Sequence, residues 1–163
     1  MGRWQFRPPV ERLRNGGFRI NLDPEERELV RRLLSELRSL MLGPSDNPAL
    51  ARLFPAAYHL PQHAEQNEEF QRLMRDELVA SRLAGIELID EALGAKPPLP
   101  SGQIEALAQG LNGLRLVLGT VLDIGEDDDP ATVSDDDPMA GEYHLYSFLS
   151  WLLEWTIRSL TGT

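Results

Sequence analysis

The segment from residue 101 to residue 122 constrains the fold most, because apolar residues occupy nearly every side of the helix that its spacing predicts. One side is lined by Ile104, Leu107, Ala108, Leu111, Leu114, Leu118 and Leu122. Another side is small and carries Ala106, Gly110, Gly113 and Val117. A helix that is apolar on most sides is buried among neighbours, and small residues let one neighbour approach closely. The segment therefore predicts the central helix of a bundle.

An earlier helix is marked by signals at both of its ends. Asp23 can serve as N-cap, Pro24 suits the first helical position, and Glu26 lies three residues after the cap, as in a capping box. Gly43-Pro44 is expected to end this helix. One apolar stripe is predicted between these ends, formed by Leu29, Val30, Leu33, Leu34, Leu37, Leu40 and Met41.

The remaining helices are a short one at about 48–53 and two long ones, at about 64–93 and 142–160. In the helix at 64–93, the predicted core face is formed by Phe70, Met74, Leu78, Leu88 and Ala92, with Ser81 and Gly85 in line between them. Gly85 marks either a close approach of two helices or a weak point in this helix. Ser101 is expected to cap the central helix.

The first 22 residues predict two or three short strands. Asn15-Gly16 between two strand-like runs favours a type I′ hairpin turn, whose two central residues need a positive φ. The fold class predicted for residues 1–163 is a single, mainly α domain: a bundle of about four main helices with a small N-terminal antiparallel β-ribbon. Its parts are expected to be a β-ribbon (1–22), a helical bundle (23–122), an acidic mobile loop (123–141) and a C-terminal helix (142–163).

The residue types exclude several kinds of chemistry. The chain has no cysteine, which rules out disulfides, thiol nucleophiles and Cys-ligated metals. His59 and His63 are separated by Pro61, which disrupts the regular helix that would direct both toward one metal. The acidic run at 126–138 does not fit the EF-hand pattern, and the chain contains no phosphate-binding loop or hydrolase motif. We therefore expect no catalytic residues, no cofactor and no metal.

Charge is distributed unevenly along the chain. The net charge is −10, yet residues 1–22 carry five arginines and one acid, so this part is +4 and the remainder −14. An acidic body argues against nucleic-acid binding, which depends on clustered Lys and Arg. The N-terminus does not resemble a signal peptide, and no apolar run approaches the roughly 20 residues of a membrane span. We expect a cytoplasmic protein that does not insert into membranes.

One charged residue interrupts the apolar central helix. Arg115 lies one turn from Leu111 and Leu118, at the edge of the large apolar face. Because an uncompensated buried charge is very costly, Arg115 is predicted to form a structural ion pair with an acid on an adjacent helix. The functional alternative makes it a hook for an anion in a cleft.

The last helix has an apolar arc broader than a single helix contact requires. Trp155 borders its core face, and Trp151 lies further round, one turn before it. Either this helix is enclosed in the bundle, or it offers Trp151 and Trp155 to another protein, since exposed tryptophans are favoured interface anchors. The basic ribbon is a second candidate contact, through Arg12, Arg14 and Arg19.

Three segments resemble an actinobacterial family known as a domain of unknown function. They are LNGLRLVLGTVL (111–122), DNPALARLFPAAY (46–58) and the arginine-rich opening before LDPEE. Members usually carry an acid where this chain has Gly113, so a polar contact made there is not expected to carry over. The resemblance implies a bacterial cytosolic protein, encoded beside the ClpS adaptor of the Clp protease. Some members are thought to act in redox-responsive transcription through cysteines, which this chain lacks.

The leading functional hypothesis is a non-enzymatic regulatory or adaptor protein that acts by protein–protein contact, with a homodimer as one form of that contact. The resemblance suggests the Clp adaptor system or the transcription machinery as partner. The alternative is a transcription-associated stress regulator that contacts RNA polymerase, a sigma factor or DNA through the basic ribbon. A third hypothesis is a small enzyme with an unrecognised carboxylate site.

Overall fold

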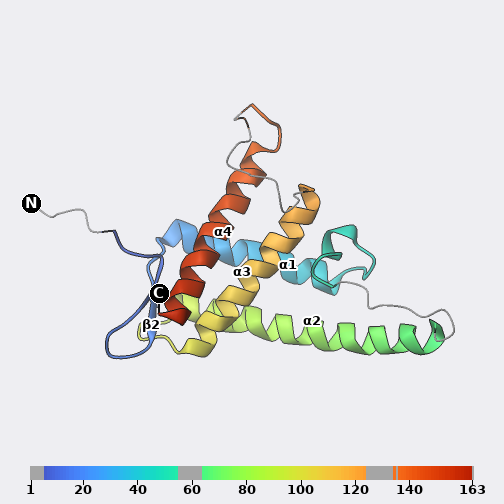
Figure 1. Cartoon of the computed structure of the whole chain (residues 1–163), viewed down its shortest axis with the longest axis horizontal. Helices are drawn as coiled ribbons and strands as arrows, with labels where there is room; N and C mark the ends of the chain where they lie inside the picture. The colour runs from blue at the N-terminus through green and yellow to red at the C-terminus, as the bar shows by residue number, and fades with distance from the viewer. Residues whose placement is uncertain (1–5, 55–63, 124–133, 135, 163) are drawn as a thin grey trace, which may run out of the picture.

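The structure, a computed structural model, describes residues 6–54, 64–123, 134 and 136–162. Two short strands, β1 (Val10–Arg12) and β2 (Phe18–Ile20), are followed by four long helices (Figure 1). The helices are α1 (Pro24–Leu42), α2 (Ala64–Gly94), α3 (Ser101–Val121) and α4 (Ala140–Thr161), with the short 3₁₀ helix η1 (Pro48–Leu50) after α1. The predicted fold class, a mainly α bundle with a small antiparallel ribbon, is confirmed.

The start of α1 follows the predicted capping box. The Glu26 backbone N–H donates to Asp23 Oδ1 at 2.8 Å, and the Asp23 N–H donates to Glu26 Oε1 at 3.1 Å. The cap of α3 was predicted wrongly, because Pro100 is the N-cap and Ser101 is already the first helical residue. A proline at the cap position offers no side-chain acceptor, so α3 begins without a side-chain cap hydrogen bond.

α3 is the central helix, as predicted, and it packs against α1, α2, α4 and η1. Its small side meets α2 closely at Gly110, where an added Cβ would lie 2.5 Å from Ile89 Cδ1. Gly85 on α2 does not mark a close approach, because nothing lies within 4 Å of the position that its Cβ would take. Gly110 therefore allows the α2–α3 contact, whereas Gly85 borders a small hollow that is also lined by Leu37 of α1 and Ala106 of α3.

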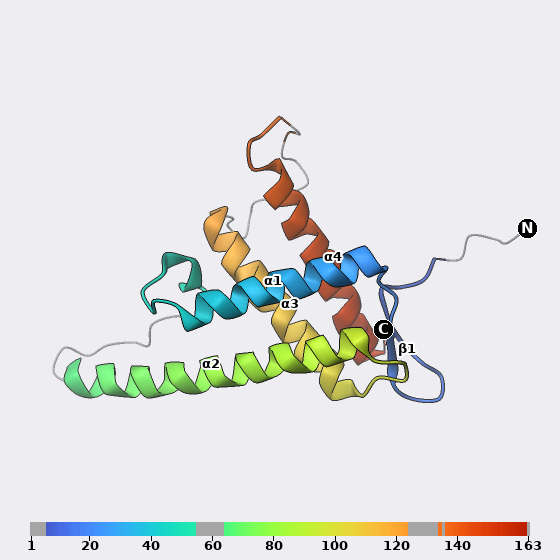
Figure 2. The same ribbon diagram turned by 180° about the vertical axis from the view of Figure 1, so that it is seen from behind.

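The predicted core face of α2 is mostly wrong. Ala92 is buried, but Phe70, Met74, Leu78 and Leu88 are exposed. The residues that pack on the bundle lie on the neighbouring side of the helix: Val79, Leu83, Ile86, Ile89 and Leu93. α2 extends well past the end of the bundle, so no other described helix lies beside its first turns (Figures 1 and 2).

The ribbon is a two-stranded antiparallel hairpin in which Val10 pairs with Ile20 and Arg12 with Phe18. The positive φ angles lie at Gly16 (+88°) and Gly17 (+81°) and not at Asn15, so the predicted type I′ turn at Asn15-Gly16 is wrong. The Leu13 N–H instead donates to the Gly17 carbonyl at 2.9 Å, which closes a three-residue loop.

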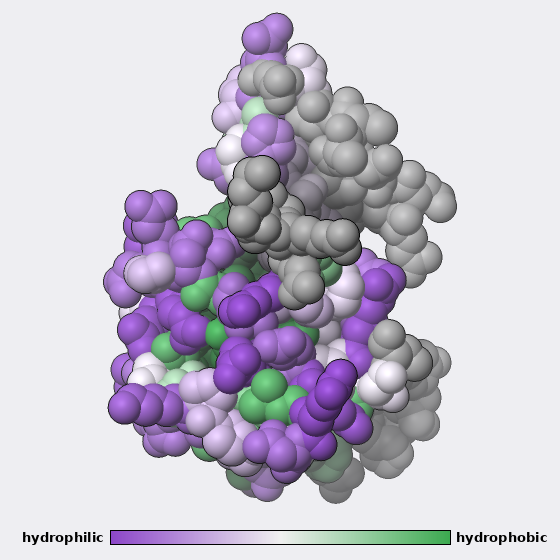
Figure 3. Space-filling view, turned by 90° about the vertical axis from the view of Figure 1, so that its left-hand side faces the viewer, coloured by the Kyte–Doolittle hydropathy of each residue, from purple (hydrophilic) through white to green (hydrophobic). Residues whose placement is uncertain are grey.

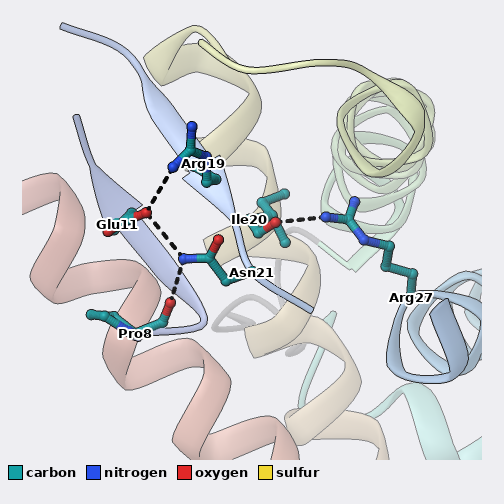
Figure 4. A network of polar contacts seen from close by, with 6 residues as sticks. All are labelled: Pro8, Glu11, Arg19, Ile20, Asn21 and Arg27. Atoms are coloured by element: carbon teal, nitrogen blue, oxygen red, sulfur yellow. Dashed lines mark hydrogen bonds and ion pairs between the residues drawn. The ribbon is translucent and has the colours of Figure 1, made fainter. Parts of the chain in front are cut away.

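Arg27 connects the ribbon to two helices, an arrangement that the sequence analysis missed. Its guanidinium donates to the carbonyl oxygens of Ile20 at 2.6 Å, Leu22 at 2.9 Å and Leu93 at 2.7 Å. Next to it, Asn21 donates to the Pro8 carbonyl at 2.9 Å and to Glu11 Oε1 at 3.2 Å (Figure 4). The end of β2, the start of α1 and the end of α2 are thus joined through one side chain.

Two predicted features fall largely outside the described residues. Of the acidic loop at 123–141, residues 124–133 and 135 are not described, and the same holds for His59 and His63. The C-terminal helix begins at Ala140, two residues before its predicted start. Among the described helices, none combines the length and the apolar character needed to cross a membrane.

Candidate interaction surfaces

α4 carries a strip of aromatic side chains along one side, which we call the α4 strip: Phe148, Trp151 and Trp155, with Phe6 beside them. Trp151 is 39% exposed, and its ring centroid lies 6.0 Å from that of Phe148. The Trp155 ring is half-buried, 5.3 Å from the Phe6 ring and 5.0 Å from the Arg158 guanidinium. Both predicted tryptophans therefore lie at the surface of the bundle rather than deep within its core.

The rings of this strip are supported by residues of the same helix. Arg158, over Trp155, also forms an ion pair with Glu154 at 2.7 Å, one turn earlier on α4. A guanidinium fixed by a carboxylate holds the aromatic ring beneath it in place. Among the described residues no guanidinium covers Trp151, and its partly exposed side chain is suited to an interface anchor.

The ribbon arginines are used mainly inside the molecule. Arg12 Nε donates to the Ser159 carbonyl at 3.1 Å, and Arg12 Nη2 to the Leu160 carbonyl at 2.6 Å. A cation at the C-terminus of a helix is favourable because the last carbonyls and the helix dipole are negative there. Arg19 pairs with Glu11 at 3.5 Å. Of the three predicted contact residues, Arg14 alone is exposed without a contact within the described part of the chain.

On the side of the molecule that carries the ribbon, the described residues left visible by the grey atoms form no continuous apolar area (Figure 3). Hydrophobic residues appear there as small patches between hydrophilic side chains (Figure 3). Monomeric proteins commonly expose such scattered apolar residues, and they do not mark an interface by themselves. The ribbon side is therefore a weaker candidate for protein contact than α4.

Arg115 was predicted to form an ion pair, and this prediction is wrong for the described residues. Its Nε donates to Ser150 Oγ at 2.8 Å, and its Nη2 donates to the Tyr146 hydroxyl at 3.3 Å. The guanidinium also lies 5.3 Å from the centre of the Tyr146 ring. Arg115 is half-buried, so solvent and these two hydroxyls together replace the expected carboxylate. It is a structural link between α3 and α4.

A pair of arginines on α2 was not identified from the sequence. The guanidinium of Arg75 lies 4.6 Å from the centre of the Phe54 ring, and that of Arg82 lies 5.8 Å from it. Arg75 Nη2 and Arg82 Nε are buried, and neither has a hydrogen-bond partner among the described residues. Burial lowers the pKa of the Arg82 guanidinium below its usual value. Arg82 Nη1 lies 3.5 Å from the position that a Cβ at Gly113 would take.

A charged groove of about 430 Å³ between α1 and α2 bears on the enzyme hypothesis. Its walls include three acids, Glu87, Asp90 and Glu91, together with Arg31 and Arg38. All three acids are exposed, and Asp90 forms an ion pair with Arg31 at 3.1 Å. Solvated acids beside arginines are typical of a polar surface. In the described part of the chain, no group of three or more metal-ligating side chains could hold a metal ion.

Residues 2–160 match the family described as a domain of unknown function, DUF2017. The chain belongs to the DUF2017 family. The predicted resemblance to a family of this kind is thereby confirmed, whereas the link of DUF2017 to the Clp adaptor stays a prediction.

The curated relatives of this DUF2017 chain include proteins named oxidative stress regulator AosR, from Mycobacterium bovis and from Mycobacterium tuberculosis. Each is 26% identical over 182 residues, which cover 90% of this chain and 83% of the relative. No solved structure matches this chain.

The position of Gly113 bears on one expectation that the family resemblance raised. The resemblance implies that other DUF2017 members carry an acid there. In this chain that position faces Arg82, whose buried Nε has no hydrogen-bond partner in the part of the chain that the structure describes. An acid at position 113 would supply the missing counter-charge. With glycine at position 113, the Phe54 ring is the partner of the Arg82 guanidinium among the described residues.

Proposed function

We propose that this protein is a non-enzymatic regulator that acts by contact with another protein through the α4 strip. Its similarity to proteins named oxidative stress regulator supports a regulatory role. The chain contains no cysteine, so thiol oxidation cannot be its signal. The regulation proposed here is therefore a binding event and not a thiol switch.

The exposure of Trp151 carries the proposal. Tryptophan contributes more to protein interfaces than most residues, because its large ring buries much apolar area with few rotatable bonds. Phe148 supports it from one turn away, and Trp155 extends the strip along the same helix. A strip of this kind suits an apolar or aromatic surface of another protein. The Clp adaptor system and the transcription machinery are the partner candidates suggested by the family resemblance.

The test is affinity capture of partner proteins from cytosol, quantified by mass spectrometry. Wild type is compared with Trp151→Ala and with Ile157→Ala, a matched control that removes a 46% exposed residue from another side of α4. Circular dichroism establishes that both variants keep the wild-type helix content. We expect a set of proteins that wild type and Ile157→Ala retain and that Trp151→Ala loses, by about tenfold or more.

Equal capture by Trp151→Ala and wild type would reject the α4 strip as the contact surface. If Trp151→Ala still captures the partner proteins and Arg14→Ala loses them, the ribbon is favoured as the contact surface. That result would support the alternative of a transcription-associated regulator. If Arg14 contacts DNA, the association constant for DNA should decrease steeply as the salt concentration rises.

A further inference from the structure

The dipeptide Asn-Gly occurs twice in the chain, at residues 15–16 and 112–113, in two different structural settings. Asn15-Gly16 lies in the loop between β1 and β2, whereas Asn112-Gly113 lies inside α3. Both asparagines are exposed, so access of solvent to the side chain does not distinguish the two sites. The backbone around each glycine does.

An asparagine followed by glycine can lose its side-chain amide without an enzyme. The backbone nitrogen of the glycine attacks the side-chain carbonyl carbon Cγ, and a new N–Cγ bond forms. The Cγ–Nδ2 bond breaks, and ammonia leaves with the proton that the backbone nitrogen gives up. Water then opens the resulting succinimide ring at either carbonyl, which yields aspartate or isoaspartate. Glycine favours the attack because it has no Cβ to hinder it and its backbone is mobile.

The loop leaves this reaction open at Asn15. Nothing lies within 4 Å of the position that a Cβ at Gly16 would take, and the loop lies at the edge of the molecule, away from the helices (Figure 1). The Gly16 N–H donates to the Leu13 carbonyl at 3.2 Å, the long end of the range for such bonds. An exposed loop bond of this length opens at little cost in free energy, which releases the attacking nitrogen.

α3 closes the same reaction at Asn112. Inside an α-helix each backbone N–H is held by the carbonyl four residues earlier, and this holds for Gly113 in the middle of α3. Gly113 is also buried, with side-chain atoms of Leu37 and Leu53 within 4 Å of its Cβ position. Ring closure must rotate the ψ angle of Asn112 away from its helical value. Because α3 is the central helix, this requires opening much of the bundle.

The other three asparagines lack one or more of the requirements. The Asn21 amide already donates to two acceptors, at 2.9 Å and 3.2 Å. Asn47 precedes a proline, which has no N–H to give up, and Asn67 precedes a glutamate. We propose that Asn15 is the site at which the folded protein is deamidated, through a succinimide formed with Gly16.

The product would change the tip of the ribbon in charge and in shape. Aspartate or isoaspartate at position 15 lowers the net charge of residues 1–22 from +4 to +3, beside the exposed Arg14. Isoaspartate also lengthens the main chain, because the backbone then runs through the side chain. Phe18 is held to Leu99 by two backbone hydrogen bonds, at 2.9 Å and 2.8 Å, so the loop must absorb the added length. The modification thus acts on the ribbon and is independent of the α4 strip.

The test follows both Asn-Gly sites in one sample of the full chain. The protein is aged at mildly alkaline pH, once folded and once unfolded in urea, then digested under acidic conditions in which the reaction is slow. Mass spectrometry measures the loss of each amide with time. In the folded protein, Asn15 should be lost about tenfold or more faster than Asn112, because α3 must open first. In urea the two rates should approach each other, since neither backbone is then held.

Asn15→Gln is the matched control, because it keeps an amide but cannot form the five-membered ring with Gly16. Ion-exchange chromatography of aged wild type should show a more acidic species that aged Asn15→Gln lacks. An Asn15 that persists in the folded protein while it is lost in urea would overturn the proposal, since the loop would then be protective. Equal loss of Asn15 and Asn112 from the folded protein, or the same acidic species from Asn15→Gln, would contradict it as well.

Discussion

Arg27→Ala should destabilise the protein far more than its place in a polar stretch of α1 suggests. The half-buried guanidinium donates three hydrogen bonds, at 2.6, 2.7 and 2.9 Å, to carbonyls of residues 20, 93 and 22. A hydrogen bond from a charged group contributes about 1.5–3 kcal/mol. Water can reach part of this site and replace some of the loss, so we expect the free energy of unfolding to decrease by about 2–4 kcal/mol.

The assay is urea unfolding followed by circular dichroism, with Arg32→Ala as the matched control. Arg32 lies on the same helix, is exposed and makes no contact in the described part of the chain, so its loss should change stability by less than about 0.5 kcal/mol. Arg27→Lys should fall between the two, because one ammonium cannot reach three carbonyls in the geometry of a planar guanidinium. The reasoning would be refuted if Arg27→Ala and Arg32→Ala unfolded at the same urea concentration.

Two further substitutions test individual glycines by urea unfolding. Gly17→Ala combines a positive φ of +81° with a Cβ placed 2.5 Å from Pro98, whereas Gly16→Ala has a φ of +88° and open space. We expect losses of about 2–4 kcal/mol for Gly17→Ala and about 1 kcal/mol for Gly16→Ala; equal losses would exclude the contact with Pro98. Gly113→Asp should be about 1 kcal/mol more stable than Gly113→Asn near neutral pH, because Arg82 lowers the pKa of the new carboxyl. That advantage should disappear as the pH falls through the lowered pKa, and an advantage that persists in acid would contradict an ion pair.

α2 shows how far periodicity in the sequence can predict packing. The existence and limits of this helix were predicted to within one residue, but the wrong side was assigned to the core. Two apolar stripes run along this helix, and their spacing alone does not show which of them faces the core. The choice depends on neighbours: α2 is roughly 46 Å long at 1.5 Å per residue, and α1 is roughly 28 Å, so part of α2 extends beyond α1.

Arg115 shows a comparable limit for the candidate sites. An ion pair was predicted for it from the cost of burying a charge, whereas its partners among the described residues are two hydroxyl groups. Tyr146 and Ser150 lie one turn apart on α4, and only the packing of α4 against α3 brings them to Arg115. Trp151 and Trp155 could be named as candidate contact residues from the sequence, because Trp155 borders the predicted core face of the last helix and Trp151 lies further round it. Contacts between distant segments, including those of Arg27, follow from the tertiary fold.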